Sequence, residues 1–280
     1  MLSFWVYLLL LFTTVLLARI SRLASERKSA RRSLLTGDSG LCVITGGGSG
    51  LGEALAHEYA ALGHPLLLIG RKHENLERAK HALIEKFGEK ASVTVLAADL
   101  EVESECIKVV EYLRDKSVFH LVNNAGVGQV SADISVSDAR SIASINLTAP
   151  AVLSAGIHAG RYIFVSSPQG LLPMPNRCVY AASKAGIHNL AESMRLDGMN
   201  VTTAYPGWIA TGLRMNARGN GLPNPQARTA RSAEDVAKEI VSAALSGKRA
   251  CCLDAKTRIV AILYSVWPEA AEFLIKCALK

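Results

Sequence analysis

The sequence lacks the cysteine and histidine patterns that hold metals or build disulfide frameworks. Its six cysteines show no C-x-x-C spacing, and its seven histidines are scattered along the chain. The pair His57-Glu58 lacks the second histidine of a zinc-binding helix. Cys42 and the pair Cys251-Cys252 lie in apolar, strand-like runs, where cysteine behaves as a small core hydrophobe. We therefore expect neither disulfides nor a metal site.

The chain also lacks an excess of charge over most of its length. Residues 1–32 hold six Lys/Arg and one acid, a net charge of +5, which leaves +2 of the total +7 for residues 33–280. Without a basic stripe, nucleic-acid binding is not indicated. With 280 residues and 50% hydrophobic content, the chain can form one large domain with a substantial core.

Residues 1–18 contain no charged side chain. As a helix they would span about 27 Å, close to the hydrocarbon thickness of a bilayer, about 30 Å. A cleaved signal peptide is the alternative, but it would place basic residues before the apolar run. Here the basic residues follow it, within a juxtamembrane linker at 19–39. The pattern favours an uncleaved transmembrane anchor over a signal peptide or a loosely attached tail, with the rest of the chain in the cytosol.

Beyond the linker, short apolar runs alternate with amphipathic stretches. The predicted strands are 41–45, 65–69, 92–97, 118–122, 161–166, 200–204 and 250–253. The predicted helices lie near 51–62, 74–87, 102–115, 133–156 (broken), 179–197 and 233–246. This alternation predicts an α/β fold at 40–255, a single doubly wound domain with a mostly parallel Rossmann-type sheet.

Two segments do not follow this alternation. Residues 207–231 are rich in Gly, Asn, Pro and Arg and are interpreted as a long substrate loop, with a surface excursion as the alternative. Residues 256–280 are strongly apolar for a chain end. They are predicted either to lie on a membrane surface or to pack on the domain as a terminal helix.

A glycine-rich turn follows the first predicted strand and precedes a helix. Glycines in such a turn let the backbone approach a pyrophosphate, and the helix N-terminus supplies N–H groups and a positive dipole end. The candidate cofactor-binding residues here are Thr45, Gly46, Gly48, Ser49, Gly50, Leu51 and Gly52.

The second predicted strand ends at Gly70, and Arg71 and Lys72 follow. A free ribose 2′-hydroxyl is usually held by an acid at this point, whereas a 2′-phosphate needs a cation. The pattern therefore favours NADPH/NADP+, with Arg71 as the phosphate contact and Lys72 as a helper. The alternative is a solvated charge at a helix start.

Tyr180 and Lys184 are four residues apart, which places both side chains on one face of a helix. A neighbouring ammonium stabilises a phenolate, so we expect the tyrosine to exchange protons nearer neutral pH than its ordinary pKa of about 10 allows. Such a pair suits protonation of a carbonyl oxygen during hydride transfer.

Over residues 40–255 these motifs resemble the short-chain dehydrogenase/reductase family. Ser167 stands thirteen residues before Tyr180, the family's catalytic spacing. Asn146 stands where the family completes a catalytic tetrad. Further positions similar to the family's cofactor site are Asp99, Leu100, Asn124, Ala125, Gly126, Pro206, Gly207, Ile209 and Thr211. These motifs follow one another along the chain in the family's order.

The resemblance implies a role for each catalytic residue. Tyr180 would act as general acid in reduction, while Lys184 would lower its pKa and reach the nicotinamide ribose. Ser167 would bind the substrate oxygen, and Asn146 would anchor a water that connects Lys184 to solvent. Asn146 lies twenty-one positions before Ser167, a short connection in the region that commonly forms the family's dimer interface. A homodimer is therefore left open.

The predicted anchor narrows the substrate to a ketone that partitions into lipid. The segment Pro206-Gly207-Trp208 looks most like the branch that contains acyl/alkyl-dihydroxyacetone-phosphate reductase, with 11-beta-hydroxysteroid dehydrogenases and retinal reductases as nearby relatives. A 3-ketosphinganine reductase ranks lower. A non-catalytic NADPH-binding membrane adaptor is the alternative of another class. The expected location is the endoplasmic reticulum membrane, with the catalytic domain facing the cytosol.

Overall fold

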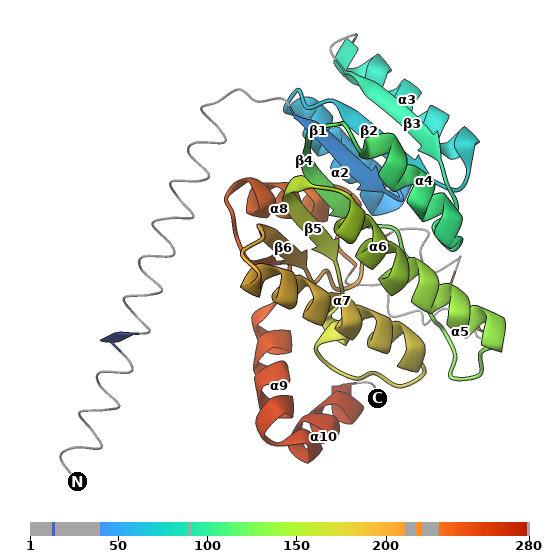
Figure 1. The fold of residues 1–280 in the computed structure, drawn as a ribbon. Helices are drawn as coiled ribbons and strands as arrows, with labels where there is room; N and C mark the ends of the chain where they lie inside the picture. The colour runs from blue at the N-terminus through green and yellow to red at the C-terminus, as the bar shows by residue number, and fades with distance from the viewer. Residues whose placement is uncertain (1–12, 15–39, 89–90, 211–216, 220–229, 279–280) are drawn as a thin grey trace.

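The structure is a computed structural model that describes residues 13–14, 40–88, 91–210, 217–219 and 230–278. Seven parallel strands form one sheet in the order β3-β2-β1-β4-β5-β6-β7 (Figure 1). Their bounds are β1 Leu41–Thr45, β2 Leu66–Gly70, β3 Val93–Ala97, β4 Val118–Asn123, β5 Ala159–Val165, β6 Val201–Ala204 and β7 Ala250–Cys251. Each predicted strand is confirmed to within two residues at its ends, and so is the Rossmann-type fold.

Strands β1 and β2 are almost wholly apolar because helices cover both faces of the sheet. Along β1, Cys42 and Ile44 pack into one core with α2 (Gly50–Ala61), α3 (His73–Phe87) and α8 (Ala233–Leu245). Val43 points the other way, into a core with α4 (Glu103–Leu113), α6 (Ala149–Gly156) and α7 (Cys178–Leu196). Side chains that alternate along a strand therefore fill both layers. Figure 1 shows helices on both faces of the sheet.

The order in which strands are added reverses between β1 and β4. Strands β2 and β3 extend the sheet on one side of β1, and β4 begins its extension on the other side. Thr45 pairs with Ile69 of β2 on one side, and Ile44 pairs with Val122 of β4 on the other. In open parallel sheets, ligands bind outside the carboxyl ends of the strands at such a switch point. This places the glycine turn and the segment after β4 at the same edge.

The broken helix predicted at 133–156 is a helical run with a widened turn. α5 (Val136–Ala143) continues into a π-helical turn η2 (Ser144–Thr148) and then into α6. Ser135 caps α5 by accepting a hydrogen bond from the Asp138 N–H at 3.0 Å. Ser232 caps α8 in the same way through the Asp235 N–H, also at 3.0 Å.

The apolar C-terminal segment forms two helices, α9 (Ala255–Val266) and α10 (Pro268–Ala278), which pack against each other (Figure 1). α9 contains no buried residue. The large apolar side chains that face outward from the two helices and their junction are Ile259, Ile262, Val266, Trp267, Phe273 and Leu274. A helix packed tightly on the domain would bury such side chains, so this pair leaves an apolar surface.

Within the described ranges, none of the helices is both long enough and apolar enough to cross a bilayer. The anchor predicted at 1–18 lies outside the described residues except for Thr13 and Thr14, and the linker predicted at 19–39 lies wholly outside them.

Candidate active site

The glycine turn between β1 and α2 adopts a conformation that other residues could not. Gly46 has φ +67°, and its N–H donates to the Ile69 oxygen at 2.7 Å. A Cβ at Gly52 would lie 2.0 Å from the Gly46 oxygen. The turn therefore brings bare backbone to the start of α2, the arrangement that accommodates a pyrophosphate. Gly48, Ser49, Gly50 and Leu51 complete this turn and helix start.

Thr45 ties the carboxyl ends of β1 and β4 together. Its hydroxyl donates to the Val122 oxygen at 3.2 Å and accepts from the Asn124 and Ala125 N–H groups at 3.0 Å. The Asn124 side chain donates to the Thr45 oxygen at 2.8 Å. Thr45 is 1% exposed, so its hydroxyl is not available to a ligand. Instead it holds the segment after β4 beside the end of β1.

Arg71 and Lys72 are exposed and leave the sheet at the same edge as the glycine turn. Asp99 follows the neighbouring strand β3 at this edge, and its carboxylate accepts from the Glu101 N–H at 3.1 Å. Leu100 is buried. The predicted ribose and adenine contacts are thus brought together beside the glycine turn.

Sequence reasoning missed Arg78 of α3. Its guanidinium donates to the Gly48 oxygen at 2.9 Å and to both oxygens of Glu53 at 2.8 Å. This cation braces the glycine turn against α2. No local motif marks it, because its partners lie 25 and 30 residues away in the chain.

Ser167, Tyr180 and Lys184 meet beyond the end of β5. Ser167 follows β5, whereas Tyr180 and Lys184 lie on α7, and all three are at most 8% exposed. The Lys184 ammonium donates to the Val165 oxygen at 2.8 Å and lies 5.8 Å from the centroid of the Tyr180 ring. The predicted catalytic trio is therefore assembled in one buried place.

The pKa values of Tyr180 and Lys184 differ from those that their spacing in the sequence predicts. Burial raises the pKa of Tyr180 above its ordinary value of 10, although a hydrogen bond to Ser167 and the charge of Arg177 both lower it. Burial lowers the pKa of Lys184 from 10.5 to about 8. The groups that act to lower the pKa of Tyr180 here are Ser167 and Arg177 rather than Lys184. The expected net lowering of the Tyr180 pKa is thus not met in this structure, because desolvation outweighs the contributions of Ser167 and Arg177.

Asn146 lies in the π-helical turn and is 1% exposed. Its amide oxygen accepts from the Val127 N–H at 2.8 Å, and its amide nitrogen donates to the Val127 oxygen at 2.9 Å and to the Ser183 hydroxyl at 3.2 Å. A Cβ at Gly126 would lie 3.2 Å from the Asn146 oxygen and 3.6 Å from the Lys184 nitrogen. The missing Cβ at Gly126 therefore leaves room for the Asn146 oxygen, and the Lys184 nitrogen lies near the same point. π-Helical turns often occur at functional sites.

The predicted substrate loop at 207–231 is described only at its two ends and at residues 217–219. Pro206 is buried and Gly207 exposed, while Ile209 forms a backbone bridge with Arg231. The guanidinium of Arg177, at the start of α7, lies 5.1 Å from the centroid of the Trp208 ring. Thr211, predicted to bind the cofactor, lies outside the described residues.

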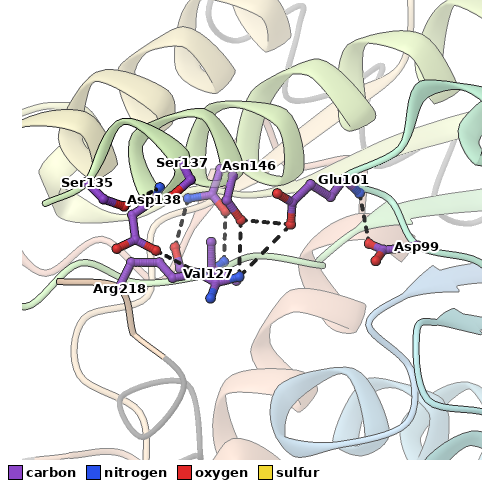
Figure 2. Close-up of polar contacts among 9 residues, drawn as sticks. Asp99, Glu101, Val127, Ser135, Ser137, Asp138, Asn146 and Arg218 are labelled. Atoms are coloured by element: carbon purple, nitrogen blue, oxygen red, sulfur yellow. Dashed lines mark hydrogen bonds and ion pairs between the residues drawn. The ribbon is translucent and has the colours of Figure 1, made fainter.

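A second contact missed by sequence reasoning joins this loop to the segment after β3 and to α5. Figure 2 shows Arg218 between the carboxylates of Glu101 and Asp138, at 4.0 Å and 3.8 Å. Arg218 also donates to the Ser141 hydroxyl at 3.2 Å, and that hydroxyl donates to Glu101 at 2.9 Å. These charges are spread over distant parts of the sequence, so their spacing carries no motif.

Among the residues that the structure describes, no cluster of three or more His, Cys, Asp or Glu side chains could hold a metal ion. The site geometry is therefore built from a glycine turn, a buried Ser-Tyr-Lys group and surface cations. Such a set of residues fits a nicotinamide dinucleotide, because the turn at Gly46 and Gly52 leaves backbone where a side chain would block it.

Comparison with known proteins agrees with this geometry. The family model described as short chain dehydrogenase matches residues 41–220. An Arabidopsis thaliana protein named 11-beta-hydroxysteroid dehydrogenase-like 4A is 32% identical over 251 residues, which cover 81% of this chain and 80% of that protein. Dehydrogenase/reductase SDR family protein 7-like from Anopheles gambiae is 30% identical over 266 residues, 86% of this chain and 83% of that protein.

Solved structures share the fold. A short-chain dehydrogenase from Sphingobium yanoikuyae in complex with NADPH has a TM-score of 0.72 at 22% identity, covering 85% of this chain and 95% of that one. A short-chain dehydrogenase/reductase from Burkholderia phymatum in complex with NAD has a TM-score of 0.69 at 23% identity, covering 81% and 94%. With its catalytic group and glycine turn in place, this chain belongs to the short-chain dehydrogenase/reductase family of oxidoreductases.

Proposed function

We propose that this protein is a membrane-anchored, NADPH-dependent reductase that converts a lipid-like ketone to the alcohol. The observation that carries the proposal is the buried meeting of Ser167, Tyr180 and Lys184 at the edge of the sheet where the glycine turn lies. The nicotinamide cofactor would supply the hydride, and the chain supplies orientation and the proton.

In this proposal each buried side chain has a defined role. The Tyr180 hydroxyl donates its proton to the carbonyl oxygen, and Ser167 donates a hydrogen bond to the same oxygen and holds it near the phenol. Lys184 holds the cofactor ribose and carries protons toward Tyr180. Asn146, close to Lys184 through Gly126, anchors a water that restores the proton from solvent.

The preference for NADP(H) over NAD(H) rests on the exposed pair Arg71-Lys72 after β2. A guanidinium at this place forms charge-assisted hydrogen bonds with a 2′-phosphate, whereas the acid that binds a free 2′-hydroxyl is replaced by Gly70 and Arg71.

The membrane part of the proposal is supported by two separate segments. Residues 1–18 are uncharged and are followed by six Lys/Arg, which favours a cytosolic catalytic domain at the endoplasmic reticulum. α9 presents Ile259, Ile262 and Val266, three and four residues apart, 62–80% exposed on one helix face. Lys256 and Arg258 lie at its start, and α9 has no acid. This apolar face with a basic end suits a lipid surface that carries anionic headgroups.

The substrate class follows from that location. Candidates in order of preference are an acyl-dihydroxyacetone phosphate or similar ketolipid, then a steroid or retinoid, and then 3-ketosphinganine. The names of the plant relatives, 11-beta-hydroxysteroid dehydrogenases, support a rigid apolar ketone as the second choice.

The test is an assay of NADPH consumption by the detergent-solubilised full chain with acyl-dihydroxyacetone phosphate, 3-ketosphinganine, a ketosteroid and retinal. We expect at least one ketone to be reduced, and faster with NADPH than with NADH. Equal rates for wild type and Tyr180→Phe would overturn the catalytic assignment. Turnover with NADH but not NADPH would overturn the role given to Arg71.

A further inference from the structure

The side chain of Gln129 is fully buried at the start of the helix that carries Tyr180. Its amide oxygen accepts hydrogen bonds from the Val179 N–H at 3.1 Å and from the Tyr180 N–H at 3.0 Å. Its amide nitrogen donates to the Ser131 oxygen at 2.7 Å. A buried amide with these three bonds is held in one orientation.

These bonds replace a missing helix cap. The first N–H groups of a helix have no partner within it, and a side chain at the N-cap usually accepts from the second or third. α7 begins at Cys178, and Arg177 at its N-cap position makes no side-chain cap bond. Val179 and Tyr180 are the second and third helical residues. Gln129 therefore does from a distant segment what a cap residue does locally.

The segment that carries Gln129 is itself held on two sides. Val127 binds both ends of the Asn146 amide (Figure 2). The Arg218 N–H donates to the Gly128 oxygen at 2.9 Å, and the Val130 N–H donates to the Arg218 oxygen at 3.0 Å. Gln129 thus joins the start of α7 to a segment fixed between the π-helical turn and residues 217–219.

We propose that Gln129 is a positioning residue, which sets the place of the Tyr180 phenol relative to Ser167 by holding the first turn of α7. The inference rests on the proposed role of Tyr180 as general acid. Its consequence is kinetic, because a displacement of about 1 Å in a reacting group can slow a reaction about a hundredfold.

The experiment compares two substitutions of Gln129 with a matched control. Gln129→Leu removes the acceptor, whereas Gln129→Glu keeps an oxygen able to accept from both N–H groups at a helix N-terminus. Ser232→Ala removes the cap of α8, which carries none of the proposed catalytic residues. Tyr180→Phe is measured in parallel. The readouts are kcat for ketone reduction, the Kd for NADPH, the thermal midpoint and the pH profile of alcohol oxidation.

We expect Gln129→Leu to lower kcat about tenfold to a hundredfold while the Kd for NADPH changes by less than about threefold. Gln129→Glu should recover at least about a third of the wild-type kcat, and its charge should move the rise of the oxidation rate to higher pH. Ser232→Ala should lower the thermal midpoint and leave kcat unchanged.

Equal losses of kcat in Gln129→Leu and Gln129→Glu, with an unmoved pH profile, would overturn the proposal. If Gln129→Leu does not fold, the kcat and pH profile of Gln129→Glu decide in the same way. An active Tyr180→Phe would instead overturn the proposed function. An inactive Tyr180→Phe beside a fully active Gln129→Leu would overturn this inference alone.

Discussion

Strand β2 and helix α9 are both rich in large aliphatic residues, yet the fold treats them in opposite ways. The four residues Leu66 to Ile69 of β2 are at most 1% exposed, because helices cover both faces of the sheet. On α9, Ile259 is 65% and Val266 is 80% exposed. Burying one such side chain contributes roughly 1.5–3 kcal/mol. The sheet has gained this free energy within the domain, whereas the large apolar side chains of α9 remain exposed.

The sheet with the helices that cover it (the buried half) is proposed to carry out catalysis, and helices α9 and α10 (the exposed half) are proposed to set the location of the protein. The buried half holds the residues proposed for hydride and proton transfer, and the exposed helix pair holds those proposed to meet a lipid surface. If the division is correct, substitutions in one half should leave the property of the other half intact.

The largest effect is expected from Tyr180→Phe in the buried half. Loss of the proton donor should lower kcat for reduction by about a hundredfold to ten thousandfold. The matched control is Tyr162→Phe, which removes another buried hydroxyl outside the proposed site. That hydroxyl donates to the Ile157 oxygen at 2.9 Å. The control should keep its kcat. Equal kcat values for the two variants, measured from NADPH consumption, would contradict the assignment.

A smaller effect is expected at the exposed rim of the cofactor edge. Arg71→Gln should raise the KM for NADPH about tenfold to a hundredfold, because a charge-assisted contact to the 2′-phosphate is lost. The KM for NADH should not change. Arg114→Gln, an exposed arginine that follows α4, is the control and should alter neither value. If the KM of Arg71→Gln for NADPH stayed at the wild-type value, the assignment of Arg71 as the 2′-phosphate contact would be wrong.

The exposed half is tested by charges placed on α9. In vesicles that hold the full chain and a lipid ketone, the double substitution Ile259→Asp and Ile262→Asp should raise the apparent KM for that ketone about tenfold. The KM for a water-soluble ketone should stay constant. Leu196→Asp places a charge at an apolar residue that is 89% exposed elsewhere, and serves as the control. A rise in both KM values, or in neither, would argue against contact between α9 and lipid.

The smallest effect concerns stability. Burial lowers the pKa of Lys184 from 10.5 to about 8, so the folded chain holds its proton more weakly than the unfolded chain does. Below pH 8 this costs about 3 kcal/mol, and the cost vanishes as pH rises to 10.5. Removing this cost in Lys184→Met should raise the thermal midpoint by a few degrees at pH 7. The variant should also be inactive, because Lys184 is proposed to hold the cofactor. Its advantage should shrink between pH 8 and 10.5, and an advantage that is absent at pH 7 would count against a costly buried ammonium.

The parts of the fold that depend on local pattern were predictable. Strand runs such as 41–45 are bounded by glycine or polar residues and match the structure, and the Gly46–Gly52 turn needs no distant partner to be recognised. Tyr180 and Lys184 are recognisable because a spacing of four residues places them on one helix face, whereas Ser167 is recognisable only from the spacing that the family resemblance implies.

What the sequence did not predict depends on contacts between distant segments. Gln129 has no local signal, because its partners Val179 and Tyr180 lie 50 and 51 residues away. Arg78 and Arg218 are likewise defined by carboxylates from other elements. The raised pKa of Tyr180 could not be read from its spacing to Lys184, since burial is a property of the folded chain. The helix pair at 255–278 was expected as an apolar segment, but its exposure required coordinates.

The central claim is that this chain moves a hydride from NADPH to a ketone while Tyr180 supplies the proton. The most direct measurement uses NADPH that carries deuterium at the transferable position, with the ketone that is reduced fastest. The account predicts an alcohol with one deuterium on its carbinol carbon from the wild-type protein, and almost none from Tyr180→Phe in the same time. An alcohol without that deuterium, or one formed equally by both proteins, would contradict it.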